Sequence, residues 1–134
     1  MMKMRKFVQN KLWRDKAHAM LKDFRSIIHV NKLSDDEFMK QLRVKLLEEA
    51  LEVQAASTQE ELMAEVGDVF EVLDAIMKFH NLSEQLIKEM QAAKRELRGG
   101  FDDRIFVTHV EHVDGTFGAN YCLQNPEKYP EILE

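Results

Sequence analysis

Apolar residues recur at helical spacing along most of the chain. A first stripe follows the i, i+4, i+7, i+11, i+14 rule and predicts a helix near residues 13–29 (Trp13, Ala17, Met20, Phe24 and Ile27). Ser34 and Thr58 are each followed three residues later by Glu, which is the pattern of a helix-capping box. These signals predict a second helix to about residue 56 and a third to about residue 80 or 81. Ser83 can begin a fourth helix that ends at Gly99, because glycine adopts left-handed backbone at low cost.

The pattern changes after Phe101, where apolar and polar residues alternate from Ile105 to His112. Such alternation is typical of a half-buried strand, and Asp114-Gly115 can form a turn into a hairpin reaching about Tyr121. The combined pattern predicts an all-α fold in one domain, residues 1–134. We expect a four-helix bundle-like core over about 11–101 and a small C-terminal β-hairpin or extended tail over about 102–134.

Composition supports a helical domain and limits its partners. The 134 residues are 45% hydrophobic, enough for one core, and only five Gly and two Pro are present. Nineteen basic against 24 acidic residues give a net charge of −5, which argues against nucleic acid as the main partner. Cys122 is the only cysteine, and no apolar run is long enough to span a bilayer, so we expect a cytoplasmic protein without a disulfide framework or membrane contact.

Acidic residues interrupt two of the predicted apolar stripes. On a helical wheel Glu49 lies about 20° from Leu42, in the middle of the apolar face, and Glu52 follows at i+3. On the third helix Glu65 lies among Leu62, Val69, Val72 and Ile76, with Asp68 at i+3. Two helices are therefore predicted to present an acidic pair to the interior, with Glu48 on the shoulder of the first pair.

A divalent cation would explain these buried carboxylates. Burying an unpaired carboxylate costs several kcal/mol, and no Cys or His stands at matching spacing, so an all-oxygen site favours Mg²⁺ or Mn²⁺. The alternative is a solvated acidic face with partial salt bridges to Lys45 or Lys78. A di-iron carboxylate bundle is disfavoured, because it needs Glu-x-x-His pairs that these helices lack.

Three segments resemble a known family. Glu48-Glu49-x-x-Glu52 followed by Glu65-x-x-Asp68 resembles the EExxE…ExxD signature of the MazG-like all-α nucleoside triphosphate pyrophosphohydrolases. Lys11-Leu-Trp-Arg-Asp-Lys16 resembles the opening segment of the phosphoribosyl-ATP pyrophosphohydrolase-like branch. Lys94 with Arg98-Gly-Gly-Phe101 resembles its closing segment.

The resemblance implies hydrolysis of a nucleoside triphosphate between the α- and β-phosphates, with Mg²⁺ as cofactor and Mn²⁺ as a substitute. By matching position it implies four metal ligands (Glu49, Glu52, Glu65 and Asp68) and four phosphate-contacting cations (Arg14, Lys16, Lys94 and Arg98). Glu48 is either a further ligand or the base that polarises the attacking water. The alternative for Lys94 and Arg98 is a pair of exposed cations stabilised by the dipole at a helix C-terminus.

The implied role is a house-cleaning nucleotide pyrophosphohydrolase. Two alternatives are the phosphoribosyl-ATP pyrophosphohydrolase of histidine synthesis and a non-catalytic helical interaction module. The histidine-pathway enzymes have a Tyr-His pair after the ExxD element, where this chain has Val69-Phe70-Glu71-Val72, and the difference argues against that pathway.

The second predicted helix is apolar on two opposite sides. Leu42, Leu46 and Val53 define one side, and Val44, Leu47 and Leu51 lie about 140° to 200° away on the wheel. A helix that is apolar all round must be buried all round, so the sequence predicts a homo-oligomer, most simply a dimer. The alternative is that the first helix and the tail cover the second side within one chain.

Overall fold

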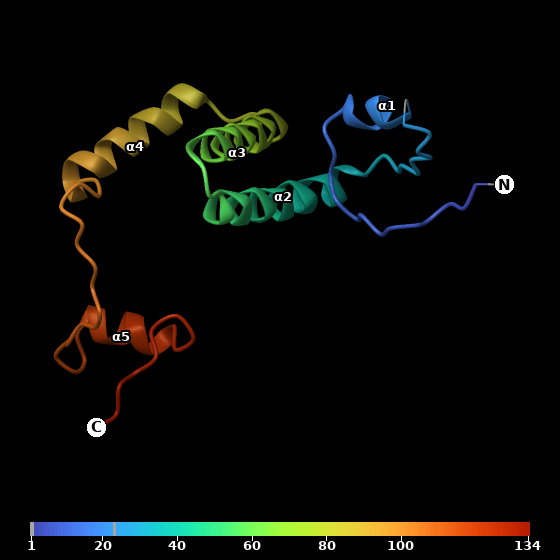
Figure 1. Cartoon of the computed structure of the whole chain (residues 1–134). Helices are drawn as coiled ribbons and strands as arrows, with labels where there is room; N and C mark the ends of the chain where they lie inside the picture. The colour runs from blue at the N-terminus through green and yellow to red at the C-terminus, as the bar shows by residue number, and fades with distance from the viewer. Residues whose placement is uncertain (1, 23) are drawn as a thin grey trace. The chain divides into compact units, whose positions relative to one another are not determined.

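The computed structural model describes residues 2–22 and 24–134, and the regular secondary structure of these residues is α-helical (Figure 1). Five helices follow one another along the chain: α1 (Ala17–Lys22), α2 (Asp35–Ala55), α3 (Gln59–Phe79), α4 (Glu84–Arg98) and α5 (Phe117–Gln124). Within the described residues there is no strand, and none of the helices has the length and apolar character needed to cross a bilayer. The chain divides into two compact units, Met1–Gln91 and Ala92–Glu134, which are described separately below.

The starts of α2 and α3 are fixed by side-chain caps, as the sequence predicts. Ser34 Oγ accepts a hydrogen bond from the Glu37 backbone N–H at 3.3 Å, and the Glu37 carboxylate accepts one from Ser34 Oγ at 3.0 Å. Thr58 Oγ1 accepts from the Glu61 backbone N–H at 3.1 Å. Each capping hydroxyl accepts a hydrogen bond from a first-turn backbone N–H that has no acceptor within the helix. Residues 56–58 are thereby left as a short connection between the two helices.

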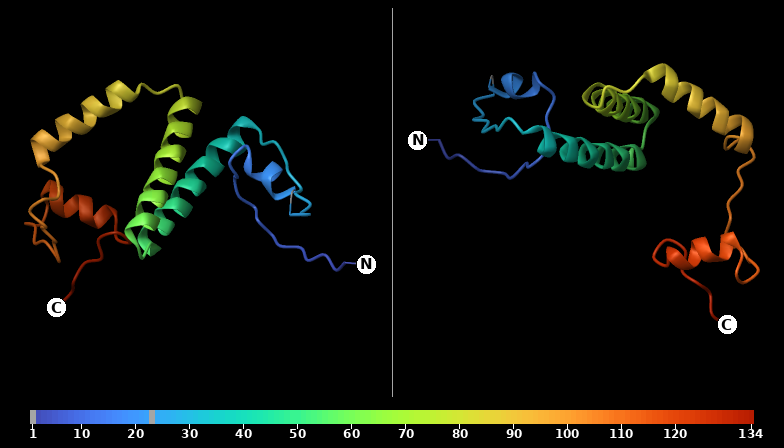
Figure 2. Two further views of the ribbon diagram at one scale, coloured as in Figure 1. Left: turned by 45° about the horizontal axis from the view of Figure 1, so that its top comes forward. Right: turned by 180° about the vertical axis from the view of Figure 1, so that it is seen from behind.

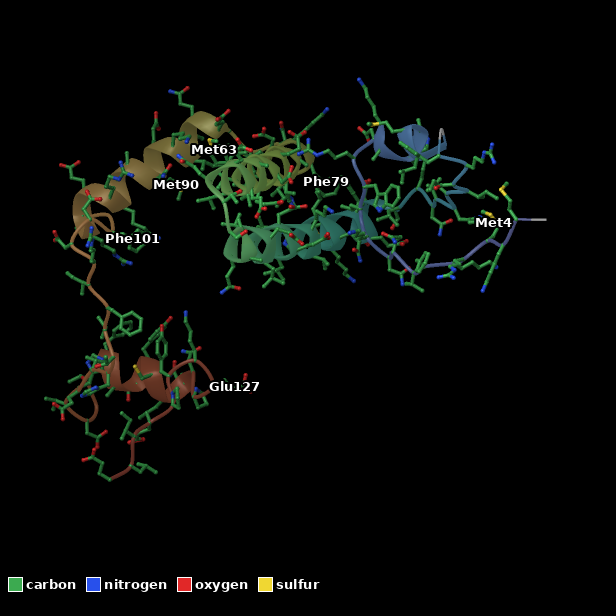
Figure 3. All side chains as sticks on the ribbon, viewed as in Figure 1. Met4, Met63, Phe79, Met90, Phe101 and Glu127 are labelled. Atoms are coloured by element: carbon green, nitrogen blue, oxygen red, sulfur yellow. The ribbon has the colours of Figure 1, made fainter. Side chains whose placement is uncertain are left out.

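Helices α2 and α3 form an antiparallel hairpin that is the centre of the first unit (Figures 1 and 2). Their apolar stripes face one another, so Leu42 and Val72 are only 3% and 7% exposed. At the open end of the hairpin Phe79, labelled in Figure 3, packs edge-to-face on Phe38 with ring centroids 5.4 Å apart. This apolar contact sets the distance at which the polar side chains of the two helices meet.

The prediction of a long first helix is wrong. Only α1, six residues long, is helical in the range 13–29, and Asp23 lies outside the described residues. Phe24 and Ile27 are exposed, and Arg25 has a left-handed φ of 62°. A short amphipathic segment without a packed apolar face does not retain helical structure by propensity alone.

Helix α4 has the predicted ends. Ser83 Oγ accepts from the Leu86 backbone N–H at 3.2 Å, and Gly99, with φ of 79°, donates its N–H to the Arg95 carbonyl at 2.7 Å. The apolar residues of its predicted stripe that carry large side chains are exposed (Leu86, Met90 and Leu97). The four-helix bundle therefore stays a prediction, whereas the all-helical class is observed.

In the second unit a helix replaces the predicted hairpin. Residues 105–113 have no regular secondary structure, and α5 occupies the positions expected for the returning strand. Phe117 and Tyr121, one turn apart, stack with centroids 6.1 Å apart, and Tyr121 contacts Tyr129 at 5.8 Å. These aromatic contacts favour a helix at α5, and without a returning strand the alternating segment has no partner to pair with.

Candidate metal centre

The turn between α2 and α3 brings Glu49 and Glu65 to the same level of the hairpin. Glu49 precedes Ala56 by seven residues, and Glu65 follows Thr58 by seven. At 1.5 Å per residue each acid is about 10 Å, or two turns, from the connection. Because seven residues are close to two full turns, each acid lies on the same side of its helix as the residue next to the connection. This is the side that faces the partner helix.

Three carboxylates converge at this level. Glu49 from α2 and Glu65 and Asp68 from α3 each offer one oxygen, and the three oxygens lie within 4.8 Å of one another. Oxygen atoms of the two helices gather in the space between α2 and α3 (Figure 3). Glu49 is 8% exposed and is the only buried charged side chain among the described residues, while Glu65 and Asp68 are half-buried. The predicted position of Glu49 within the apolar face is confirmed.

Loss of solvent and neighbouring negative charges disfavour ionisation of Glu65. Loss of solvent around the carboxyl, followed by the negative charges of Asp68, Glu52 and Glu49, raises the pKa of Glu65 above its ordinary value of 4.5. A carboxyl group without a cation beside it is expected to have a raised pKa, because nothing offsets the loss of solvent and the like charges. The cluster is therefore short of positive charge at Glu65.

Lys45 partly compensates the acidic residues of α2. Its Nζ lies 3.3 Å from Glu48 Oε2 and 3.5 Å from Glu49 Oε1, at i+3 and i+4 spacing. These contacts agree with the alternative interpretation that Lys45 forms salt bridges on this face. The ammonium group neutralises one charge, which leaves the carboxylates of α3 to other partners.

Two cations from the N-terminal segment supply further compensation. Lys11 Nζ lies 3.2 Å from Glu48 Oε1 on α2. Arg14 Nη2 lies 2.6 Å from Asp68 Oδ1 on α3, and Arg14 Nη1 lies 3.9 Å from Glu71 Oε2. A segment without helical structure thus contacts both helices of the hairpin at the level of the acidic cluster.

Both oxygens of Glu48 accept hydrogen bonds from lysine. Burial acts to raise the pKa of Glu48, but the hydrogen bonds and charges of Lys11 and Lys45 outweigh it, and the pKa lies below its ordinary value. In this arrangement Glu48 is ionised and held beside the cluster. Its position on the shoulder agrees with the sequence analysis and suits either a further ligand or a group that orients water.

The remaining predicted site residues lie outside the three-carboxylate cluster. Glu52 is exposed on α2, although its charge contributes to the raised pKa of Glu65. Lys16 is exposed just before α1. Lys94 and Arg98 are exposed on the last turns of α4, one turn apart, and belong to the second unit.

Sequence reasoning missed the role of Lys11 and Glu71 at this site. Lys11 entered the analysis only as the first residue of a motif, yet it contacts Glu48 across 37 positions of sequence. Glu71 shares Arg14 with Asp68. The only sequence signal was that Lys11 and Arg14 are two cations three residues apart.

The donor set suits a hard divalent cation. All three converging groups are carboxylates, they come from two rigid helices, and one is nearly excluded from solvent. Such a set can bind Mg²⁺ or Mn²⁺ through oxygen, with further positions left for water or a phosphate. Comparison with known proteins adds no relative, because no family model, curated protein or solved structure matches the chain.

Proposed function

We propose that this protein is a Mg²⁺-dependent nucleotide pyrophosphohydrolase that cleaves a nucleoside triphosphate, or a related nucleotide, to the monophosphate and pyrophosphate. The observation that carries the proposal is the convergence of Glu49, Glu65 and Asp68 within 4.8 Å. These are the residues that the resemblance to MazG-like pyrophosphohydrolases marks as ligands. The house-cleaning role implied by that resemblance belongs to the same proposal.

Under this proposal each group near the cluster has a separate task. Glu49, Glu65 and Asp68 hold the metal, and Glu52 joins them from the exposed side of α2. Bound Mg²⁺ supplies neutralisation of phosphate charge and a lowered pKa for water. Glu48, which accepts a hydrogen bond from Lys45 on the same helix, orients the attacking water through its carboxylate or acts as a further ligand.

In this proposal four cationic side chains bind the phosphates of the nucleotide substrate. Arg14 already lies at the cluster, and Lys16 follows it by two residues. Lys94 and Arg98 present their charges one turn apart on α4. Hydrogen bonds from these groups to phosphate oxygens would hold the substrate for in-line attack.

Calorimetric titration with Mg²⁺ tests the metal centre. Binding to the wild-type protein should be lost in the double variant Glu49→Gln, Glu65→Gln, which keeps the shape of both side chains and removes two charges. A matched control is Glu60→Gln with Glu84→Gln, two exposed acids in the first turns of α3 and α4. Equal Mg²⁺ affinity in the cluster variant and the control would contradict the assignment.

Product analysis tests the reaction. A panel of canonical and modified nucleoside triphosphates with Mg²⁺ should give monophosphate and pyrophosphate in equal amounts for at least one substrate. Diphosphate and orthophosphate as products would show that the bond cleaved is the wrong one. Absence of turnover with every nucleotide would favour a non-catalytic role.

We propose further that the chain functions as a homodimer. Val44, Leu47 and Leu51 form a second apolar side of α2, and Leu47 is 67% exposed. Water contact with a row of aliphatic side chains is unfavourable, and a second copy of the same helix offers a complementary surface. Light scattering at micromolar concentration should give twice the mass of one chain, and a mass of 15.7 kDa would refute the dimer.

A helical interaction module is the second candidate. The observation in its favour is that Lys45 and Arg14 already pair with Glu49 and Asp68, so part of the cluster is neutral without a metal. In that case the exposed apolar side of α2 would bind another protein. The module predicts neither Mg²⁺ binding nor pyrophosphate release, so calorimetric titration and product analysis separate it from the enzyme.

A further inference from the structure

Residues 11–14 form an N-terminal strap that joins the two helices of the hairpin at the candidate metal centre. Lys11 pairs with Glu48 on α2, and Arg14 pairs with Asp68 and Glu71 on α3. The Lys11–Glu48 and Arg14–Asp68 pairs span 37 and 54 positions of sequence. Residues 11–14 are not helical. These ion pairs are the polar contacts that hold the strap on the hairpin.

The strap and a divalent cation would compete for the same carboxylate, that of Asp68. Arg14 Nη2 lies 2.6 Å from Asp68 Oδ1, and Asp68 is one of the three groups whose oxygens converge. A guanidinium at this distance occupies part of the acceptor capacity of the Asp68 carboxylate, which a metal also needs. The positive charge of Arg14 would also repel a cation brought to the cluster.

The strap is held weakly enough to be displaced. The side chains of Arg14 and Lys11 are 59% and 40% exposed, so solvent screens both ion pairs. A divalent ion has twice the charge of either side chain and can contact several carboxylates at once. Mg²⁺ therefore has the advantage once its concentration exceeds its dissociation constant.

We propose that the N-terminal strap is an internal counter-ion of the metal centre, and that a divalent cation displaces it from Asp68 and frees Arg14 and Lys11 to bind the phosphates of the substrate. This inference rests on the proposed function, because it takes the acidic cluster as the metal centre. It adds Lys11 to the substrate-binding cations and couples metal loading to phosphate binding. Without metal, the same cations reduce the repulsion among the carboxylates.

The chain carries its own reporter for this movement. Trp13 is the only tryptophan and lies between Lys11 and Arg14, where it is half-buried. Displacement of the strap changes the solvent exposure of the indole ring. Intrinsic fluorescence of the chain therefore follows the movement of the strap without an added label.

The test is a titration of the chelator-treated full chain with Mg²⁺, followed by Trp13 emission and, in parallel, by calorimetry. We expect a saturable change in emission with the same midpoint as the calorimetric curve, and no such change with NaCl at equal ionic strength. The double variant Lys11→Gln, Arg14→Gln should show the released emission before metal is added. It should bind Mg²⁺ about two- to fivefold more tightly, in proportion to the weak ion pairs removed.

Lys3→Gln with Arg5→Gln is the matched control, since both are exposed cations of the same N-terminal segment and one lysine and one arginine are replaced, as in the strap variant. Circular dichroism confirms that the helices are intact in each variant. An unchanged Trp13 emission during Mg²⁺ binding, or equal affinity in the strap variant and wild type, would overturn the strap while the metal centre stands. If Mg²⁺ binds neither protein, both proposals fail. If Mg²⁺ displaces the strap but no nucleotide gives pyrophosphate, the strap proposal is upheld and the enzymatic function is refuted.

Discussion

Replacement of Glu49 by leucine should stabilise the metal-free protein. Glu49 is 8% exposed and stands on the same stripe as Leu42, which is 3% exposed, so a leucine at this position would be buried almost as completely. Burial of a leucine side chain contributes about 1.5–3 kcal/mol. The cost is the ion pair with Lys45 at 3.5 Å, worth up to about 1 kcal/mol, and Lys45 keeps Glu48 as a partner.

The substitution also removes a buried charge that lies beside Glu65 and Asp68. We therefore expect the free energy of unfolding to rise by about 1–3 kcal/mol in EDTA, because leucine burial is gained while Lys45 keeps Glu48 as its partner. For a chain of this size the midpoint of thermal unfolding should rise by about 3–10 °C. Saturating Mg²⁺ should stabilise the wild-type protein and leave Glu49→Leu unchanged.

Thermal and urea denaturation followed by circular dichroism measures both effects, at one protein concentration throughout. Glu52→Leu is the matched control, because Glu52 is exposed one turn further along α2 and its replacement should change stability by less than about 0.5 kcal/mol. A Glu49→Leu variant that is less stable than wild type in EDTA would refute the reasoning. It would show that Glu49 is a structural residue held by Lys45.

Four further predictions follow from particular side chains. Leu42→Ala should lower the free energy of unfolding by about 2–3 kcal/mol in urea denaturation, near the low end for a buried leucine because half-exposed neighbours can close the cavity. Hydrogen bonds from the Ser57 backbone and hydroxyl lower the pKa of Glu61, so its contribution to stability is complete above pH 4.5 and is lost as the pH falls through the lowered value. In Glu61→Gln the free energy of unfolding should therefore fall less steeply as the pH is lowered below 4.5. An unchanged slope in that pH range would contradict this role of Glu61. Lys94→Ala should reduce kcat/KM in steady-state assays while leaving calorimetric Mg²⁺ affinity unchanged, whereas Leu47→Glu should give the mass of one chain in light scattering.

Local signals in the sequence were sufficient for the starts of α2, α3 and α4 and for the end of α4. Ser34 and Thr58 act through hydrogen bonds to residues three positions away, and Gly99 acts through its own backbone, so no distant contact is needed to predict them. The position of Glu49 followed from helical periodicity, since a single helix fixes which residues share a face. The helical class and the convergence of the acids from two helices were accessible for that reason.

Contacts between distant segments were not accessible. Arg14 meets Asp68 across 54 positions, and nothing in the local pattern of either segment specifies that pair. The apolar spacing from Trp13 to Ile27 predicted a long helix, yet α1 is the only helix among its described residues and the later apolar residues of this stripe are exposed (Met20, Phe24 and Ile27). In the tail, alternation from Ile105 to His112 was outweighed by contacts of Phe117 and Tyr121 in α5.

The equal spacing of Glu49 and Glu65 from the α2–α3 connection constrains how this protein can tolerate insertions and deletions. One residue added between Glu49 and Ala55 rotates the acid by about 100° around α2 and raises it by about 1.5 Å, which removes it from the face that meets α3. Only a matching change of whole turns on both helices keeps the acids level. Length variation should therefore accumulate outside the span from Glu49 to Asp68, and a gap within that span marks a chain that has lost the centre.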